Sequence, residues 1–230
     1  MITPQPNPAN TAATPILNTA STEVANLTRE VRSRSNSDRE FVQVAHRILC
    51  ERVAPVYTVN ELQPASATLR KKKGSCSQRM GCLEAVARSA SIPTRVHALF
   101  VRGEFWYPRF RFAKRFIPSQ ILLLWPQFFV GEWLDFDELH ASTEETVRKF
   151  PGFRNNAESL FEAVGSASVD FLGKSCGMAC ARAEHDLSRF VISNAGLFDQ
   201  RDEALEKLGS FQHTLRGRAF EFLYGGRKSV

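Results

Sequence analysis

The hydrophobic period of this chain changes at Pro93, and the change limits the folds that are open to it. Before Pro93 the apolar residues recur at helical spacing and form one stripe: Met80, Leu83, Ala87 and Ala90. After Pro93 they alternate with their neighbours, as on a strand with one buried face: Val96, Ala98 and Phe100. The sequence therefore predicts a helix over about 76–91, ended by the proline and followed by a strand.

The remaining periodic segments give the order of the other elements. Further strand patterns follow Pro93 at 105–112, 125–130 and 133–136. Helical patterns lie on both sides of the strands, after a capping box at 37–40, from 157 onward, near 180–193 and over 202–223. Arg102-Gly103 and Gly131-Glu132 suit the tight turns of hairpins. The order indicates an α+β fold, with an antiparallel sheet packed against helices and additional C-terminal helices.

Composition divides the chain into three parts. Residues 1–22 are rich in Pro, Asn, Thr and Ala and carry no charged side chain, which predicts a disordered arm. We expect residues 23–156 to form the core domain and residues 157–230 a helical extension packed on the same domain. The chain of 230 residues, 43% of them hydrophobic, is long enough to bury one sizeable core.

A membrane protein is not expected from this sequence. The longest apolar stretch, 116–133, contains two prolines and several polar residues, so it cannot span a bilayer. No Lys or Arg precedes Arg29, and the five cysteines are irregularly spaced, which favours a reducing compartment. The prediction is a cytoplasmic protein without a membrane contact.

Positive charge is concentrated in one block of the sequence. Residues 69–115 hold twelve Lys and Arg against two acids, and the rest of the chain holds eighteen bases and twenty-two acids. Such a block favours an anionic partner, which could be an acidic protein, a phosphate-bearing ligand or nucleic acid.

Cys76 lies at the start of the predicted helix, directly after Gly74-Ser75. A thiol at this position experiences the positive end of the helix dipole and the free amides of the first turn. Neighbouring bases add to the positive field: Arg70, Lys71, Lys72, Lys73 and Arg79. Both effects favour the thiolate, the form that attacks carbonyl carbons. The alternative interpretation is a small buried cysteine with a purely structural role.

Two segments resemble the transglutaminase-like superfamily, which has a papain-like core. In the first, a Gly-x-Cys opens an Ala-rich helix that is followed by Ile-Pro-x-Arg-Val, here residues 74–76 and 92–96. In the second, 123–137 follows the family pattern of His-x-Trp, a turn, a Trp and an Asp. The resemblance covers about residues 69–137.

The resemblance implies a Cys-His-Asp arrangement with one departure. Carried over by position, Cys76 is the nucleophile and Asp137 the acidic member, with Asp135 a less well aligned choice. The position of the histidine is occupied by Leu123. In such an arrangement the imidazole takes the proton of the thiol and protonates the leaving group.

Other histidines could replace the missing one. His97, on the predicted strand after Pro93, is the candidate to replace the catalytic histidine. The alternative interpretation is that His97 is a core histidine with satisfied hydrogen bonds. His140 follows Asp137 on a predicted loop and is expected at the surface. His46 is expected on the solvent-exposed face of its helix.

Metal and nucleic-acid sites are only weakly indicated. Cys176, Cys180 and His185 have ligand-like spacing but lack a fourth ligand at recognisable spacing, so we predict neither a metal nor a cofactor. The aromatic and arginine residues of 105–112 could stack on bases, but a strand with aromatics inward explains them equally well and there is no RNP-type motif.

Together these features predict an enzyme of acyl transfer through a thioester, which forms or cleaves an amide. The resemblance to this superfamily and the basic block favour an acyl or peptide substrate, with the acyl group carried on an acidic carrier protein, as in natural-product biosynthesis. The alternative is a binding module that kept the transglutaminase-like fold and lost its triad. Leu123 favours the module, and Cys76 with its basic surroundings favours the enzyme.

Overall fold

The structure is a computed structural model that describes residues 4–110, 114, 117–140, 153, 155, 159–165, 169–173, 187–209 and 214–228. Its helices are α1 (Thr22–Arg32), α2 (Asp38–Arg52), α3 (Ala65–Lys71), α4 (Cys76–Ser89), α6 (Leu160–Ala163), α7 (Arg201–Leu208) and α8 (Leu215–Tyr224). Its strands are β1 (Ala54–Pro55), β2 (Lys73–Gly74), β3 (Thr94–Arg102), β4 (Gln120–Phe129), β5 (Trp133–Asp135) and β6 (Val191–Phe198).

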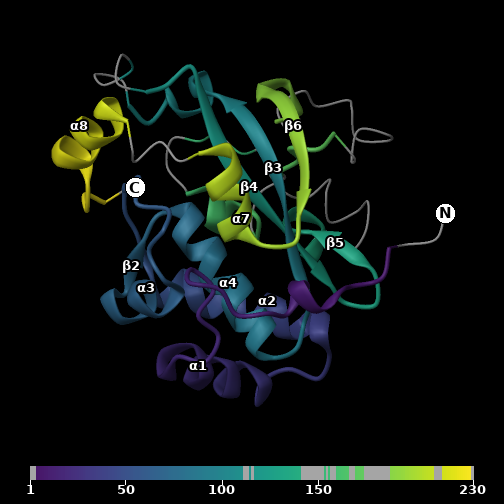
Figure 1. Cartoon of the computed structure of the whole chain (residues 1–230). Helices are drawn as coiled ribbons and strands as arrows, with labels where there is room; N and C mark the ends of the chain where they lie inside the picture. Colours follow the sequence, from purple (N-terminus) through teal and green to yellow (C-terminus); the bar gives the residue numbers. More distant parts are fainter. Residues whose placement is uncertain are drawn as a thin grey trace.

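A four-stranded antiparallel sheet in the order β5-β4-β3-β6 forms one layer, and helices α1 to α4 lie together on one side of it (Figure 1). β3 and β4 are paired along their whole length, which places Leu99 opposite Leu123 and His97 opposite Trp125. The short strands β1 and β2 pair in parallel beside the start of α4. The α+β fold and the shared sheet of β3, β4 and β5 confirm the sequence prediction.

Helix α4 is the centre of the core and confirms the helix expected over 76–91. Its residues 78–88 are all buried, because it packs against α1, α2 and α3 as well as β3 and β4. Alanines and Gly81 keep the helix narrow enough for such close neighbours. The helix ends before Pro93, as the sequence predicts.

The strand predicted over 105–112 is absent from the part of that segment that the structure describes. Gly103–Trp106 forms a 3-10 helix, η2, and the described residues that follow form a turn. Phe105 is buried against Phe153, Phe171 and Phe190, so tertiary packing outweighs the strand pattern. A Cβ on Gly103 would lie 1.9 Å from the Pro118 carbonyl oxygen, and this close approach requires glycine.

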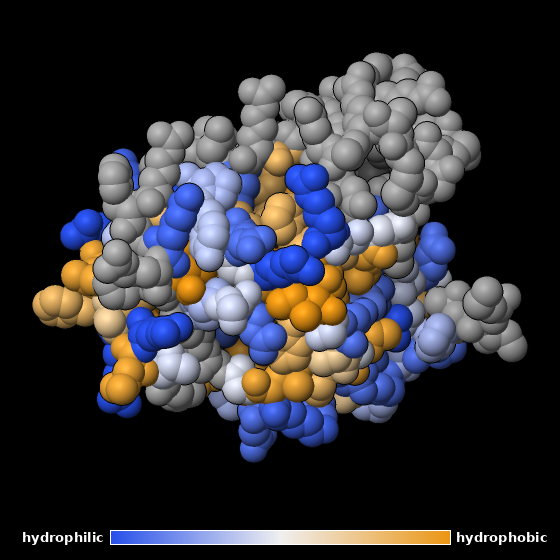
Figure 2. Space-filling model, turned by 90° about the horizontal axis from the view of Figure 1, so that it is seen from above, coloured by the Kyte–Doolittle hydropathy of each residue, from blue (hydrophilic) through white to orange (hydrophobic). Residues whose placement is uncertain are grey.

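The C-terminal part differs from the expected run of helices. The described part of 180–193 enters β6, which pairs with β3 and adds an edge strand to the sheet. The helix expected over 202–223 is divided into α7 and α8, and α7 ends at Gly209 with a φ of +84°. Figure 2 shows hydrophobic residues at the surface on the side where α8 lies, and Leu215 and Phe222 are 83% and 90% exposed.

The N-terminal segment packs on the core, in contrast to the disordered arm expected for 1–22. Ile16 and Leu17 are buried, and Thr14 Oγ1 donates to Asp202 at 2.5 Å. Arg88, buried in α4, donates from Nη1 to the carbonyl oxygens of Ala9 and Ala12 at 3.0 and 2.9 Å. The segment has no charge of its own, and charged groups of α4 and α7 satisfy its polar backbone.

The described part of the apolar stretch, 117–133, contains strand β4 and the start of β5. Across the described residues, the structure contains no helix with the length and apolarity needed to cross a membrane.

Candidate functional site

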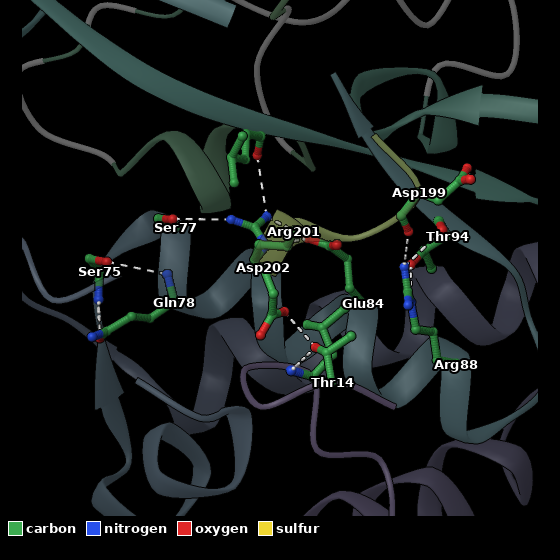
Figure 3. A network of polar contacts seen from close by, with 12 residues as sticks. Thr14, Ser75, Ser77, Gln78, Glu84, Arg88, Thr94, Asp199, Arg201 and Asp202 are labelled. Atoms are coloured by element: carbon green, nitrogen blue, oxygen red, sulfur yellow. Dashed lines mark hydrogen bonds and ion pairs between the residues drawn. The ribbon is translucent and has the colours of Figure 1, made fainter. Parts of the chain in front are cut away.

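Cys76 is the first residue of α4, and the local sequence determines this position. Ser75 caps the helix, accepting at its Oγ from the Gln78 amide at 3.2 Å, while Gln78 Oε1 accepts from the Ser75 amide at 3.1 Å (Figure 3). A Cβ on Gly74 would lie 2.7 Å from Thr68 Cγ2, so glycine is needed directly before the cap. The thiol of Cys76 is free and half-buried.

A mostly apolar cavity of about 180 Å³ lies beside Cys76. Its walls come from the first turn of α4, from β4, from residues 56–61, from η2 and the turn after it, and from α8. Cys76 and Leu123 both line it, so the structure brings together the nucleophile position and the position at which the family has histidine.

Asp137 lies away from this cavity lining. It follows β5 in the 3-10 helix η4 (Phe136–Leu139), and its Oδ1 accepts from Trp125 Nε1 at 2.8 Å. Desolvation, followed by the nearby charge of Asp135, raises the pKa of Asp137 to about 8. The carboxyl group is therefore mostly protonated at pH 7, whereas orienting an imidazolium requires a carboxylate.

His97 lies with Asp135 and not with Cys76. Its Nε2 is 3.3 Å from Asp135 Oδ1, which also accepts from Gln127 Nε2 at 2.6 Å. Within the described part of the chain, none of the residues that line the Cys76 cavity is a histidine. His185 and His213 lie outside the described residues.

His46 and His140 form a second pair, and the expectation that His46 is exposed is wrong. His46 is 3% exposed; its Nε2 lies 2.7 Å from the Phe161 carbonyl oxygen and its Nδ1 3.0 Å from His140 Nε2. Desolvation, together with the charge of His140, lowers the pKa of His46 to about 3. His140 is itself partly buried. The helix face of His46 is covered by η4 and α6, which the local pattern did not reveal.

The basic block is less exposed than its residue count suggests. Arg79 is wholly buried, where it pairs with Glu162 and lies over the Phe161 ring at 4.5 Å. Arg70 forms an ion pair with Glu23 at 2.8 Å. Three exposed bases remain directly before Ser75 and Cys76: Lys71, Lys72 and Lys73.

Arg201 is a positioning residue that the sequence analysis missed. From the start of α7 it donates to Ser77 Oγ at 3.2 Å, to the Leu124 carbonyl oxygen at 3.3 Å and to Glu84 at 2.9 Å (Figure 3). It thereby connects the residues next to Cys76 and Leu123. The signal was Glu84, the one acidic residue of this helix, because a carboxylate on a helix that is packed on several sides needs a base as partner.

The weaker sequence signals are not developed further by the structure. Cys176, Cys180 and His185 lie outside the described residues, and the residues that the structure does describe contain no cluster of metal-ligating side chains. Phe105 and Phe110 pack in hydrophobic clusters, although the described part of 105–112 forms no strand. Arg111 and Phe112 lie outside the described part.

The family model of the transglutaminase-like superfamily matches residues 25–138, which include Cys76, Leu123 and Asp137. This chain belongs to that superfamily, in agreement with its fold and with the placement of Cys76 at the start of the central helix. Comparisons with curated proteins and with solved structures gave no match.

Proposed function

We propose that this protein transfers an acyl group through a thioester on Cys76. The supporting observation is the position of Cys76: a free, half-buried thiol in the first turn of a helix, where it lines an apolar cavity. Helix dipole and free amides at this position stabilise a thiolate and the oxyanion that forms when a carbonyl is attacked.

The missing imidazole favours a thioester as the acyl donor. Cleavage of an amide expels an amine, which needs a proton from a general acid, and Leu123 cannot supply one. A thioester expels a thiolate, which leaves as a stable anion without a proton. The arrangement at Cys76 is therefore better suited to amide formation from a thioester than to amide hydrolysis.

The proposed reaction balances without a further reactant. The Cys76 thiolate attacks the acyl carbonyl carbon, the donor C–S bond breaks, and the donor thiolate leaves. An amine then attacks the acyl-Cys76 thioester, the Cys76 C–S bond breaks to restore the thiolate, and the nitrogen loses its proton to water. No change of oxidation state occurs. The chemistry requires reduced thiols, which is why we also propose a cytoplasmic location.

An acidic carrier protein is the donor that the surface charge favours. Lys71, Lys72 and Lys73 are exposed and directly precede the Ser75 cap of α4. A carrier bound at these lysines would present its thioester at the first turn of the helix. Steering of this kind acts mainly on the association rate.

A binding module without catalysis is the second candidate. Two features favour it: Leu123 replaces the imidazole, and burial raises the pKa of Asp137 to about 8. In a module the cavity would hold its ligand without a covalent bond, and Cys76 would be dispensable.

Intact mass after incubation with a simple acyl thioester, such as hexanoyl-N-acetylcysteamine, tests the proposal. We expect the parent protein to gain one acyl group and Cys76→Ala to gain none, while Cys82→Ala serves as the matched control with one buried thiol removed. Leu123→His should then add hydrolysis of an activated ester. Lack of an adduct in both the parent and Leu123→His would leave the binding module as the function.

A further inference from the structure

The Cys76 cavity lies between two hydrophobic clusters. The main core contributes Phe105, Leu123 and Leu160 to its walls, while the other side comes from a smaller cluster. The buried members of that smaller cluster are Phe110, Ile117 and Phe220. A space with apolar side chains on both sides and a thiol at its edge suits an apolar group that is attached to a reacting carbonyl.

Helix α8 forms the far wall of the cavity, opposite the main core, and hydrogen bonds to residues 57–59 hold the helix in this position. Glu221 accepts from Thr58 Oγ1 at 2.9 Å and from the Val59 amide at 2.8 Å. The Gly226 amide donates to the Tyr57 carbonyl oxygen at 2.8 Å. Phe220 is thereby turned toward the cavity with 7% exposure, whereas Phe222, two residues later, is 90% exposed.

The volume of the cavity limits the size of this group. An apolar cavity of about 150 Å³ in a protein can bind benzene. The cavity beside Cys76, at about 180 Å³, has room for slightly more than one such ring. A group of roughly six to eight carbon atoms therefore fits, and a long fatty chain would extend beyond the walls.

We propose that the Cys76 cavity selects the acyl group: a medium-length alkanoyl or an arylacetyl group, with its apolar part between the two clusters and its carbonyl at Cys76. This inference rests on the acyl transfer proposed above. Leu123 has a direct role in it, because an aliphatic side chain in place of an imidazole makes the wall of the cavity shared with Cys76 more apolar. The departure from the family pattern thus becomes a specificity feature.

A chain-length series tests the assignment. Intact mass would follow acylation of Cys76 by acetyl, butyryl, hexanoyl, octanoyl, dodecanoyl and phenylacetyl thioesters of N-acetylcysteamine. Each buried methylene should raise the second-order rate by up to about fourfold, so hexanoyl should exceed acetyl by more than tenfold. The rate should then fall at dodecanoyl. Equal rates for acetyl and octanoyl would overturn the assignment and leave acyl transfer itself intact.

Variants on one helix provide a matched pair. Phe220→Ala removes the far wall and should abolish the fall at dodecanoyl, while Phe222→Ala, on the exposed side of α8, should leave the series unchanged. Ile121→Trp fills the cavity and should move the maximum to shorter chains. Circular dichroism and Tm would verify that each variant folds. If Ile121→Trp folds and leaves the chain-length series unchanged, the acyl chain does not bind in the Cys76 cavity.

A non-covalent measurement separates this inference from the proposed function. Hexanamide and phenylacetamide would be titrated calorimetrically into Cys76→Ala and into Cys76→Ala with Ile121→Trp. One outcome is that no thioester acylates Cys76, while the amides bind to Cys76→Ala but not to the variant that also carries Ile121→Trp. The proposed acyl transfer is then wrong, and the proposal that the cavity binds an apolar group is supported. If neither acylation nor binding occurs, both proposals are wrong.

Discussion

The first turn of α4 and the β4–β5 hairpin contribute to the candidate site in different ways. The first turn has a capped helix and a free thiol at a cavity, as a nucleophile needs. The hairpin presents Leu123 to that cavity, while the acidic residues at its end contact other side chains: Asp135 on β5 contacts His97 and Gln127, and Asp137 in η4 accepts from Trp125. The thiol and the acidic residues of the family pattern therefore lie in two separate environments within one fold.

The largest expected effect comes from the residue that joins the two regions. Arg201→Met leaves Glu84 as a buried charge without its partner and frees both Ser77 and Leu124, so we expect a loss of about 3–5 kcal/mol in unfolding free energy. Urea unfolding would measure it. The double variant Arg201→Met with Glu84→Met should recover much of the loss, and a loss equal to that of the single variant would show that the ion pair is not its cause.

Thiol reactivity distinguishes the α4 end from the rest of the core. Desolvation raises the pKa of Cys50 and Cys82 to about 12, so both are mostly unreactive thiols at neutral pH. We expect iodoacetamide to alkylate Cys76 at least about a hundredfold faster than either at pH 7. Peptide mapping over time would measure the three rates. Similar rates would favour a merely structural Cys76.

Near the end of the β4–β5 hairpin, Asp137 should make the stability of the protein depend on pH. Because the pKa of Asp137 is raised from 3.8 to about 8, the folded state binds a proton that the unfolded state has lost, and stability falls as pH rises from about 4 to 8. Asp137→Asn keeps an acceptor for Trp125 and should flatten this part of the Tm profile. Asp38→Asn, at an exposed carboxylate, is the control. If the pH dependence of Tm is the same in Asp137→Asn as in the parent, Asp137 is charged in the folded parent and its pKa is not raised.

The smallest effect concerns the exposed lysines before Cys76. Reversing Lys71, Lys72 and Lys73 to Glu should slow acylation by an acidic carrier-bound thioester roughly tenfold at low salt, and little at high salt. Acylation by the uncharged N-acetylcysteamine thioester should not change, which serves as the internal control. A rate that is independent of salt in the parent would remove the carrier from the proposal.

Local sequence was sufficient for elements whose signals are short-range. The start of α4 at Cys76, its end before Pro93 and the strands β3, β4 and β5 followed from hydrophobic period and proline, because neighbouring residues alone decide these features. The prediction that Leu123 and Cys76 share one site required in addition the resemblance to a known family. It could not come from spacing, since 46 residues of chain separate the two.

Only the tertiary structure decided which polar groups are buried and with whom. His46 faces η4 and α6, Arg201 reaches Glu84 and Ser77 from more than a hundred residues away, and the uncharged N-terminal segment is held by Arg88 and Asp202. The strand pattern of 105–112 yielded to burial of Phe105 among other aromatic rings. Such choices depend on long-range packing and desolvation, whose energies exceed local propensities and leave no periodic trace in the sequence.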